Sequence, residues 1–172
     1  MFNLQDYIRD VPDFPKPGVV YKDITPLLQD PEAAKKATEI LLEKLNGLKI
    51  DKVVGIESRG FFFATLLAER LHAGFVPIRK PGKLPYETYR ENYSLEYGED
   101  VLEIHKDAIK QGEKVLIHDD VLATGGTAAA ACRLVEKMGG EIVQCNFLME
   151  LAFLHGKDKL KPYQVVSLLT VE

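Results

Sequence analysis

The fold is decided by residues 115–127, which read VLIHDDVLATGGT. The apolar run at 114–118 predicts a buried strand, and the alanine-rich residues 127–138 predict a helix. The residues between them predict a loop that carries two adjacent carboxylates, Asp119 and Asp120, and a Gly-Gly pair flanked by threonines. A strand, a short loop and a helix in this order predict one unit of an α/β sheet.

The same alternation extends along the chain in both directions. Asp30 as N-cap and Pro31 in the first turn predict a helix that ends before Gly47. A second helix is expected at 61–72, and further strands are expected at 52–56, 75–79, 141–148 and 165–169. This spacing predicts a twisted, mainly parallel central sheet with helices on both faces, in one domain spanning residues 1–172.

Two segments depart from this alternation. Near the N-terminus, helical spacing from Leu4 to Val11 predicts a short amphipathic helix, and three prolines in 11–18 predict a stiff extended loop. The other segment, residues 80–98, begins with KPGKLP and predicts a long functional loop. Alternation in 93–97 and 101–105 predicts a hairpin across residues 98–100.

Composition excludes several classes of function. The chain has 172 residues, with 22 Lys and Arg against 26 Asp and Glu, so its net charge is −4. This balance argues against nucleic-acid binding. The sequence predicts no signal peptide, no membrane span and, with two cysteines and no CxxC pair, no disulfide framework or zinc site. We expect a cytoplasmic protein, with Cys132 and Cys145 as small buried residues.

Residues 119–127 have the chemistry of a ribose 5-phosphate pocket. Backbone N–H groups at a helix N-terminus bind a phosphate, and the hydroxyls of Thr124 and Thr127 add donors. Asp119 and Asp120 offer acceptors for sugar hydroxyls or for water around Mg²⁺, at the sheet edge where open α/β folds bind ligands. The alternative is a helix cap beside two solvated acids. His118 is expected to be a packed histidine.

A second anion site is expected at residues 55–60, which read GIESRG. The spacing begins like a P-loop, but Phe61 and Phe62 stand where Lys and Ser or Thr are needed, so a nucleoside-triphosphate P-loop is excluded. Backbone N–H groups and the Arg59 guanidinium can still bind an anion here. The alternative is an ordinary turn between a strand and a helix.

Residues 119–127, DDVLATGGT, resemble the phosphoribosyl pyrophosphate signature of the type I phosphoribosyltransferases in every defining position. The resemblance covers essentially the whole chain. It implies the fold of that family, with a small N-terminal hood (residues 1–30) and a mobile lid (residues 80–98). It also implies that phosphoribosyl pyrophosphate is bound by Asp119, Asp120, Ala123, Thr124, Gly125, Gly126 and Thr127, and its pyrophosphate by Glu57, Ser58, Arg59, Arg79 and Lys83.

The hood indicates the acceptor. Residues 12–27 resemble the hood of the adenine-specific members of this family, as do residues 78–85 and 93–98. The resemblance implies adenine binding at Val20, Tyr21 and Lys22, with AMP and pyrophosphate as products. Apolar hood residues that only cap the core are the alternative for this segment. For the whole chain, the alternatives are a transferase for 6-oxopurines and a non-catalytic sensor of phosphoribosyl pyrophosphate.

The resemblance also implies catalytic roles for Glu96, Arg59 and Arg79. Glu96 is the candidate acid/base group near the purine, and Tyr97 belongs to the same lid motif. Arg79, Lys80 and Lys83 form a basic cluster that either faces solvent or meets the pyrophosphate. Magnesium is expected to arrive with phosphoribosyl pyrophosphate, with no direct protein ligand and possible contacts through water to Asp119 and Asp120. A homodimer is typical of the family.

Overall fold

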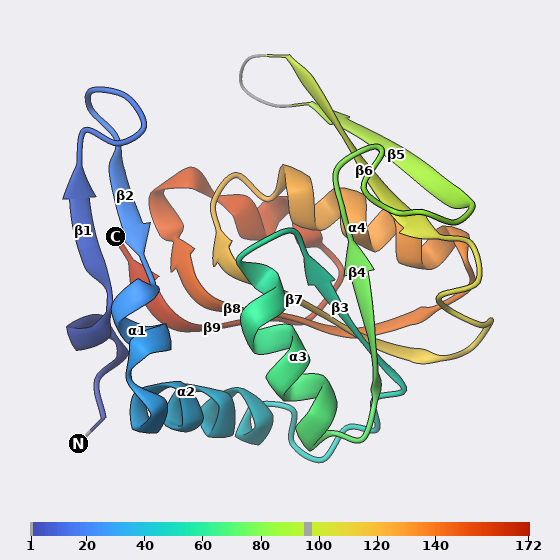
Figure 1. Ribbon diagram of the computed structural model, residues 1–172, viewed down its shortest axis with the longest axis horizontal. Coiled ribbons are helices and arrows are strands. Elements are labelled where there is room, and N and C mark those ends of the chain that lie inside the picture. The colour runs from blue at the N-terminus through green and yellow to red at the C-terminus, as the bar shows by residue number, and fades with distance from the viewer. Residues whose placement is uncertain (1, 95–97) are drawn as a thin grey trace.

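A five-stranded parallel sheet forms the centre of the computed structural model, which describes residues 2–94 and 98–172 (Figure 1). The spatial order is β4-β3-β7-β8-β9, and every neighbouring pair is parallel. The bounds are β3 Lys52–Ile56, β4 Gly74–Ile78, β7 Lys114–Leu122, β8 Glu141–Leu151 and β9 Val165–Val171. The predicted α/β fold with a parallel central sheet is therefore confirmed.

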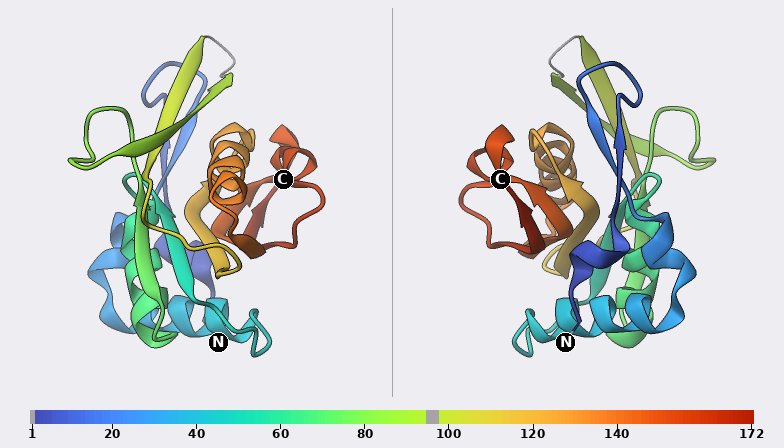
Figure 2. Two further views of the ribbon diagram at one scale, coloured as in Figure 1. Left: turned by 90° about the vertical axis from the view of Figure 1, so that its right-hand side faces the viewer. Right: turned by 90° about the vertical axis from the view of Figure 1, so that its left-hand side faces the viewer.

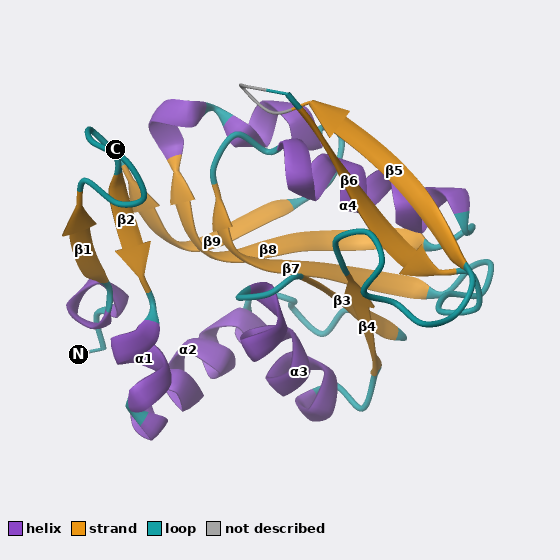
Figure 3. Cartoon of the chain, turned by 45° about the horizontal axis from the view of Figure 1, so that its top comes forward, coloured by secondary structure: helices purple, strands orange, loops and turns teal. Residues whose placement is uncertain are grey.

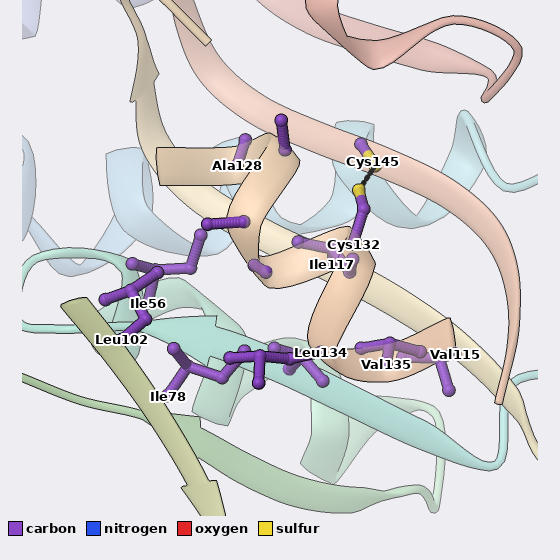
Figure 4. Close-up of a cluster of buried hydrophobic side chains, with 14 of the residues drawn as sticks. Ile56, Ile78, Leu102, Val115, Ile117, Ala128, Cys132, Leu134, Val135 and Cys145 are labelled. Carbon is purple, nitrogen blue, oxygen red and sulfur yellow. Dashed lines mark hydrogen bonds between the residues drawn. The ribbon is translucent and has the colours of Figure 1, made fainter. Parts of the chain in front are cut away.

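Helices cover both faces of this sheet (Figure 3). On one face, α2 (Pro31–Glu43) and α3 (Gly60–Arg70) bury a cluster that includes Leu41 and Phe63. On the other face, α4 (Gly126–Lys137) buries Leu134 and Val135 against the sheet (Figure 4). Burial of apolar side chains on both faces explains why the strands read as continuous apolar runs.

The helix starts follow the sequence signals, with small shifts. The Asp30 carboxylate accepts the N–H groups of Glu32 and Ala33, as an N-cap does. Cys132 and Cys145 are buried and unbridged, with 3.7 Å between their Sγ atoms, as the sequence predicts (Figure 4). Among residues 2–94 and 98–172, no helix is long and apolar enough to cross a bilayer.

The hood is a hairpin with short helices on each side. It consists of η1 (Leu4–Tyr7), β1 (Arg9–Pro12), β2 (Val20–Asp23) and α1 (Thr25–Gln29). The predicted helix from Leu4 to Val11 is wrong beyond its first turn, because Arg9–Pro12 pairs antiparallel with Val20–Asp23. The proline-rich segment forms the tip of this hairpin.

The lid segment is more regular than the sequence predicts. β5 (Thr88–Ser94) pairs antiparallel with β6 (Glu99–His105), as the predicted hairpin requires, and β5 begins earlier than expected; residues 95–97 of the predicted first strand lie outside the described residues. Residues 88–94 therefore form a strand, not a loop. Figure 2 shows this hairpin and the hood rising from the same end of the molecule.

The strand that carries the two acids is also longer than predicted. β7 continues through Asp119 and Asp120 to Leu122, although residues 119–126 were expected to form a loop. The reason is that its ladder with β8 continues, with Asp119 opposite Phe147 and Val121 opposite Met149. Beyond β8, two 3₁₀ helices that the sequence did not indicate follow: η2 (Ala152–Leu154) and η3 (Gly156–Leu160).

Candidate active site

One cavity at the carboxyl ends of β3 and β7 brings together residues from each predicted part of the site, whereas Val20, Lys22, Arg79 and Lys83 do not line it. Its volume is about 410 Å³, and it is open to solvent. The hood, the 57–60 turn and the lid hairpin all contribute to its wall, together with the end of β7. Its polar lining comes from Tyr21, Glu57, Ser58, Arg59, Lys80, Tyr93, Asp119, Asp120 and Thr127.

The phosphate loop, residues 123–127, lies beside this cavity. Gly125 has a φ of +77°, a left-handed conformation that favours glycine, and α4 begins at the next residue. A smaller cavity of about 70 Å³ is lined by Ala123, Thr124, Gly125 and Thr127, with Asp119 at its edge. The free N–H groups of the first helical turn and two threonine hydroxyls thus surround a space of anion size.

The two acids stand at the end of β7 in a low-dielectric position. Asp120 is 4% exposed, and one Asp119 carboxylate oxygen accepts the Asp120 N–H at 2.9 Å. Burial raises the pKa of Asp119 well above its ordinary value, and the neighbouring Asp120 charge raises it further. Burial also raises the pKa of Asp120, although the Arg59 guanidinium opposes that shift.

Arg59 joins the acids to the hood. Its Nη1 donates to the Tyr21 hydroxyl at 2.7 Å and to the Lys22 carbonyl at 2.9 Å, and its Nη2 lies 2.7 Å from an Asp120 carboxylate oxygen. The guanidinium also lies over the Tyr21 ring, 4.7 Å from its centroid. The guanidinium therefore links the 57–60 turn to the hood through Nη1 and to the end of β7 through Nη2.

Glu57 gathers the cations of the pyrophosphate site. It accepts the Lys80 N–H at 2.7 Å, contacts Arg79 at 3.3 and 3.4 Å, and pairs with Lys83. Burial alone would raise the pKa of Glu57, but the hydrogen bonds from Lys83, the Lys80 N–H and Arg79 lower it below its ordinary value. Glu57 therefore stays ionised and holds these cations near the cavity.

Two cavity residues were not assigned by sequence reasoning. The Lys80 ammonium pairs with Asp100 and donates to the Tyr93 hydroxyl at 2.9 Å, so it connects the cavity wall to the lid hairpin. Lys80 belongs to the basic cluster with Arg79 and Lys83, and both Lys80 and Tyr93 lie in stretches that carry the family resemblance, but neither pattern indicates their contact with each other.

The proposed base-binding residues lie on β2. Tyr21 packs against Phe14 edge-on, with 5.1 Å between ring centroids, and Val20 is 48% exposed. The Lys22 ammonium pairs with Asp10 at 2.7 Å, away from Arg59, which contacts only the Lys22 carbonyl. Val20 is therefore open to solvent, whereas Tyr21 lines the cavity.

The structure tests the prediction for His118 but not those for Glu96 and Tyr97. His118 is fully buried and its Nδ1 lies 2.7 Å from Asn146 Oδ1, so it is a packed histidine as predicted. Glu96 and Tyr97 lie outside the described residues. Within the described ranges, no three His, Cys, Asp or Glu side chains come together as a metal cage.

A glycine at the start of α3 lets the two anion-binding turns approach each other. A Cβ at Gly60 would lie 2.7 Å from an Asp119 carboxylate oxygen and 3.2 Å from the Asp119 Cα. Any side chain there would push the 57–60 turn away from β7. Gly60 is thus a third residue, after Lys80 and Tyr93, whose importance is not evident from the local sequence.

This fold, with an anion-binding turn after each of two neighbouring strands, is matched by a family model. The model for the phosphoribosyl transferase domain matches residues 23–171. The chain therefore belongs to the phosphoribosyltransferases, and its relatives define the branch as the adenine phosphoribosyltransferases.

Three comparisons define that branch. An adenine phosphoribosyltransferase of Christiangramia forsetii is 70% identical over 96% of this chain and 97% of the relative. The crystal structure of the Rhodothermus marinus enzyme of that name has a TM-score of 0.94 at 56% identity, covering 98% of this chain and 96% of its own. That of Saccharomyces cerevisiae, complexed with adenine and an imino-altritol bisphosphate, has a TM-score of 0.90 at 44% identity, covering 96% of each chain.

Proposed function

We propose that this chain transfers the 5-phosphoribosyl group of phosphoribosyl pyrophosphate to N9 of adenine, giving AMP and pyrophosphate in purine salvage. The observation that carries the proposal is the cavity of about 410 Å³ in which the hood, the 57–60 turn and the two acids face each other. The hood offers a surface for the base, the 57–60 turn offers one for the pyrophosphate, and the two acids offer one for the ribose. The relatives' names support adenine as the base.

Each surface then has a defined role. The phosphate loop binds the 5-phosphate, and Asp119 and Asp120 bind the ribose hydroxyls. Val20, Tyr21 and the Lys22 backbone bind adenine. The pyrophosphate is bound by Glu57, Ser58, Arg59, Arg79 and Lys83, with Glu57 acting through the cations that it holds.

The chemistry follows from the charges on these surfaces. The adenine N9 lone pair forms a bond to C1′ while the bond from C1′ to the pyrophosphate oxygen breaks, and the N9 proton leaves to a base, for which Glu96 is the candidate. Positive charge develops on the sugar beside Asp119 and Asp120, and negative charge develops on the leaving group beside Arg79 and Lys83. Charges fixed in advance at these places stabilise the transition state.

The hood contributes by position. Arg59 holds the Tyr21 side chain and the Lys22 backbone in place relative to Asp120, so a base bound on β2 is held near C1′. Such positioning replaces an encounter between two molecules by a reaction within one complex. In this proposal the lid, residues 80–98, closes over the site and excludes water, which would otherwise attack C1′, release pyrophosphate and leave ribose 5-phosphate.

Magnesium, assembly and location complete the proposal. Asp119 and Asp120 are oxygen donors at the cavity edge, which fits Mg²⁺ that keeps its waters and is held mainly by substrate phosphates. Mg²⁺ bound with the substrate neutralises charge on the pyrophosphate.

We further propose one domain over residues 1–172, working as a cytoplasmic homodimer without nucleic acid or membrane partners. Light scattering should give twice 19.3 kDa, and EDTA should abolish AMP formation.

The test is product formation from phosphoribosyl pyrophosphate and Mg²⁺ with adenine, hypoxanthine, guanine and xanthine in parallel. We expect AMP from adenine alone, and none from the Asp119→Asn/Asp120→Asn variant. Asp107→Asn, which changes an exposed carboxylate outside the cavity, should behave as wild type. Turnover of a 6-oxopurine would refute the role of the hood, and binding without turnover would indicate a sensor.

A further inference from the structure

The phosphate loop is supported from behind by a segment far along the chain. Residues 152–160, which form η2 and η3 after the end of β8, pack against the loop between β7 and α4 (Figure 1). Leu160 of this segment is fully buried in the same cluster as Leu122 and Ala128, which flank the loop on either side. Gly156 and Leu160 are the buried residues of this segment, so Leu160 anchors an otherwise largely exposed segment beside the loop.

The contact itself is made by two glycines. A methyl group on Gly156 would overlap the Ala123 carbonyl oxygen and would lie 3.1 Å from the Gly125 amide nitrogen. A methyl group on Gly125 would likewise overlap the Gly156 carbonyl oxygen and lie 3.1 Å from the Gly156 Cα. The two backbones therefore touch directly, and neither position has room for a side chain.

The two glycines differ in what requires them. Gly125 has a φ of +77°, so its conformation alone favours glycine. Gly156 lies outside the left-handed region, so any residue could adopt its backbone conformation. What requires glycine at 156 is the close approach to the loop, because the atoms in the way are backbone atoms that cannot rotate aside.

The supporting segment is fixed on its other side by a buried charge. The Lys157 ammonium pairs with Glu150 at the end of β8, and the Glu150 side chain is only 7% exposed. His155, between the two 3₁₀ helices, has a φ of +52° and turns the chain back toward the loop. Gly156 is thus held between β8 and the phosphate loop.

We propose that Gly156 is a positioning residue for the 5-phosphate site. This inference rests on the proposed function, in which residues 123–127 bind that phosphate. Contact with Gly156 sets where the Ala123 carbonyl and the Gly125 N–H lie, and so sets the direction of the N–H groups that follow at the start of α4. A displacement of about 1 Å at such a site costs about 100-fold in rate.

The first test is Gly156→Ala. We expect the Kd for ribose 5-phosphate, measured by calorimetry, and the KM for phosphoribosyl pyrophosphate to rise about 10- to 100-fold. The KM for adenine should change less than twofold, because none of residues 152–160 lines the cavity that Tyr21 lines. Gly74→Ala is the matched control, since Gly74 also has an ordinary φ and a Cβ there would meet only the flexible Lys52 side chain. The control should keep both constants.

A milder variant covers the case in which Gly156→Ala does not fold. Glu150→Gln keeps the size of the side chain but removes the charge that fixes Lys157, and we expect a rise of a few fold in the Kd for ribose 5-phosphate. A folded Gly156→Ala protein with wild-type affinity would overturn the inference. So would an unfolded Gly156→Ala protein combined with wild-type affinity in Glu150→Gln. A wild-type protein that makes no AMP would instead refute the proposed function.

Discussion

Replacing Arg59 by lysine tests whether the guanidinium fork couples the hood to the acids. Lysine keeps the positive charge, and it can stay near Asp120, but it cannot also reach the Tyr21 hydroxyl and the Lys22 carbonyl. Hydrogen bonds from charged donors contribute about 1.5–3 kcal/mol each. Because the Arg59 side chain is 28% exposed, we take the lower value for each bond.

The expected cost is therefore about 3 kcal/mol for the two lost bonds, or about 100-fold in kcat/KM for adenine at saturating phosphoribosyl pyrophosphate. Tyr21→Phe alone removes one of these bonds, and it should cost about 10-fold. In the Arg59→Lys background, Tyr21→Phe should cost less than twofold, since its partner is already gone. The assay is the steady-state rate of AMP formation for the four proteins of this cycle.

Arg70→Lys serves as the matched control, because Arg70 is an exposed arginine at the far end of the same helix. It should leave kcat/KM within about twofold of wild type. Equal costs of Tyr21→Phe in both backgrounds would show that the two residues act independently. That result would refute the coupling of the hood to Asp120 through Arg59.

Three further predictions concern buried groups. Burial lowers the pKa of His118 to about 4, so below pH 6.5 the unfolded chain binds more protons than the folded protein. Between pH 7.5 and 5, the free energy of unfolding should therefore fall about 2 kcal/mol less in His118→Gln than in wild type. Urea unfolding at both pH values measures this difference. In Gly60→Ala the new Cβ overlaps Asp119, so we expect kcat to fall at least 10-fold and the free energy of unfolding to fall by about 1–3 kcal/mol. A wild-type kcat would contradict this prediction. Because burial raises the pKa of Asp119, its ionised form is penalised in the folded state at neutral pH. Asp119→Asn should therefore raise the free energy of unfolding, measured in urea, by about 1 kcal/mol while activity falls about 100-fold. An unchanged free energy of unfolding would refute this prediction.

The order of strands and helices was predictable because each parallel strand is buried on both faces. β3 therefore contains the apolar run from Val53 to Ile56, whereas β8 also carries the fully buried Gln144 and Asn146. Element ends were less predictable, because pairing extends beyond the apolar residues. β7 includes two carboxylates only because β8 continues alongside it, which the local sequence of residues 119–122 does not indicate.

The candidate site was predictable where its chemistry is local. The phosphate loop and the 57–60 turn each supply their donors from a few consecutive residues. The links between segments were not predictable, since they join residues far apart in the chain. Arg59 contacts Tyr21, which lies 38 residues earlier. Gly125 contacts Gly156, and no pattern in the sequence indicates that contact.

The carboxylates of the site are held in two opposite electrostatic states, and this division fits the proposed reaction. Glu57 is surrounded by cations and its pKa is lowered, so it stays ionised. Asp119 and Asp120 lie side by side at the end of β7 and burial raises the pKa of both, but only Asp120 is paired with Arg59, so the negative charge of Asp119 is the less stabilised of the two. A sugar that becomes positively charged beside this pair would relieve that unfavourable charge, and it would do so most strongly in the transition state. Under the proposed function, the unfavourable charge of Asp119 would favour the positively charged transition state, which is why Asp119→Asn is expected to change stability and activity in opposite directions.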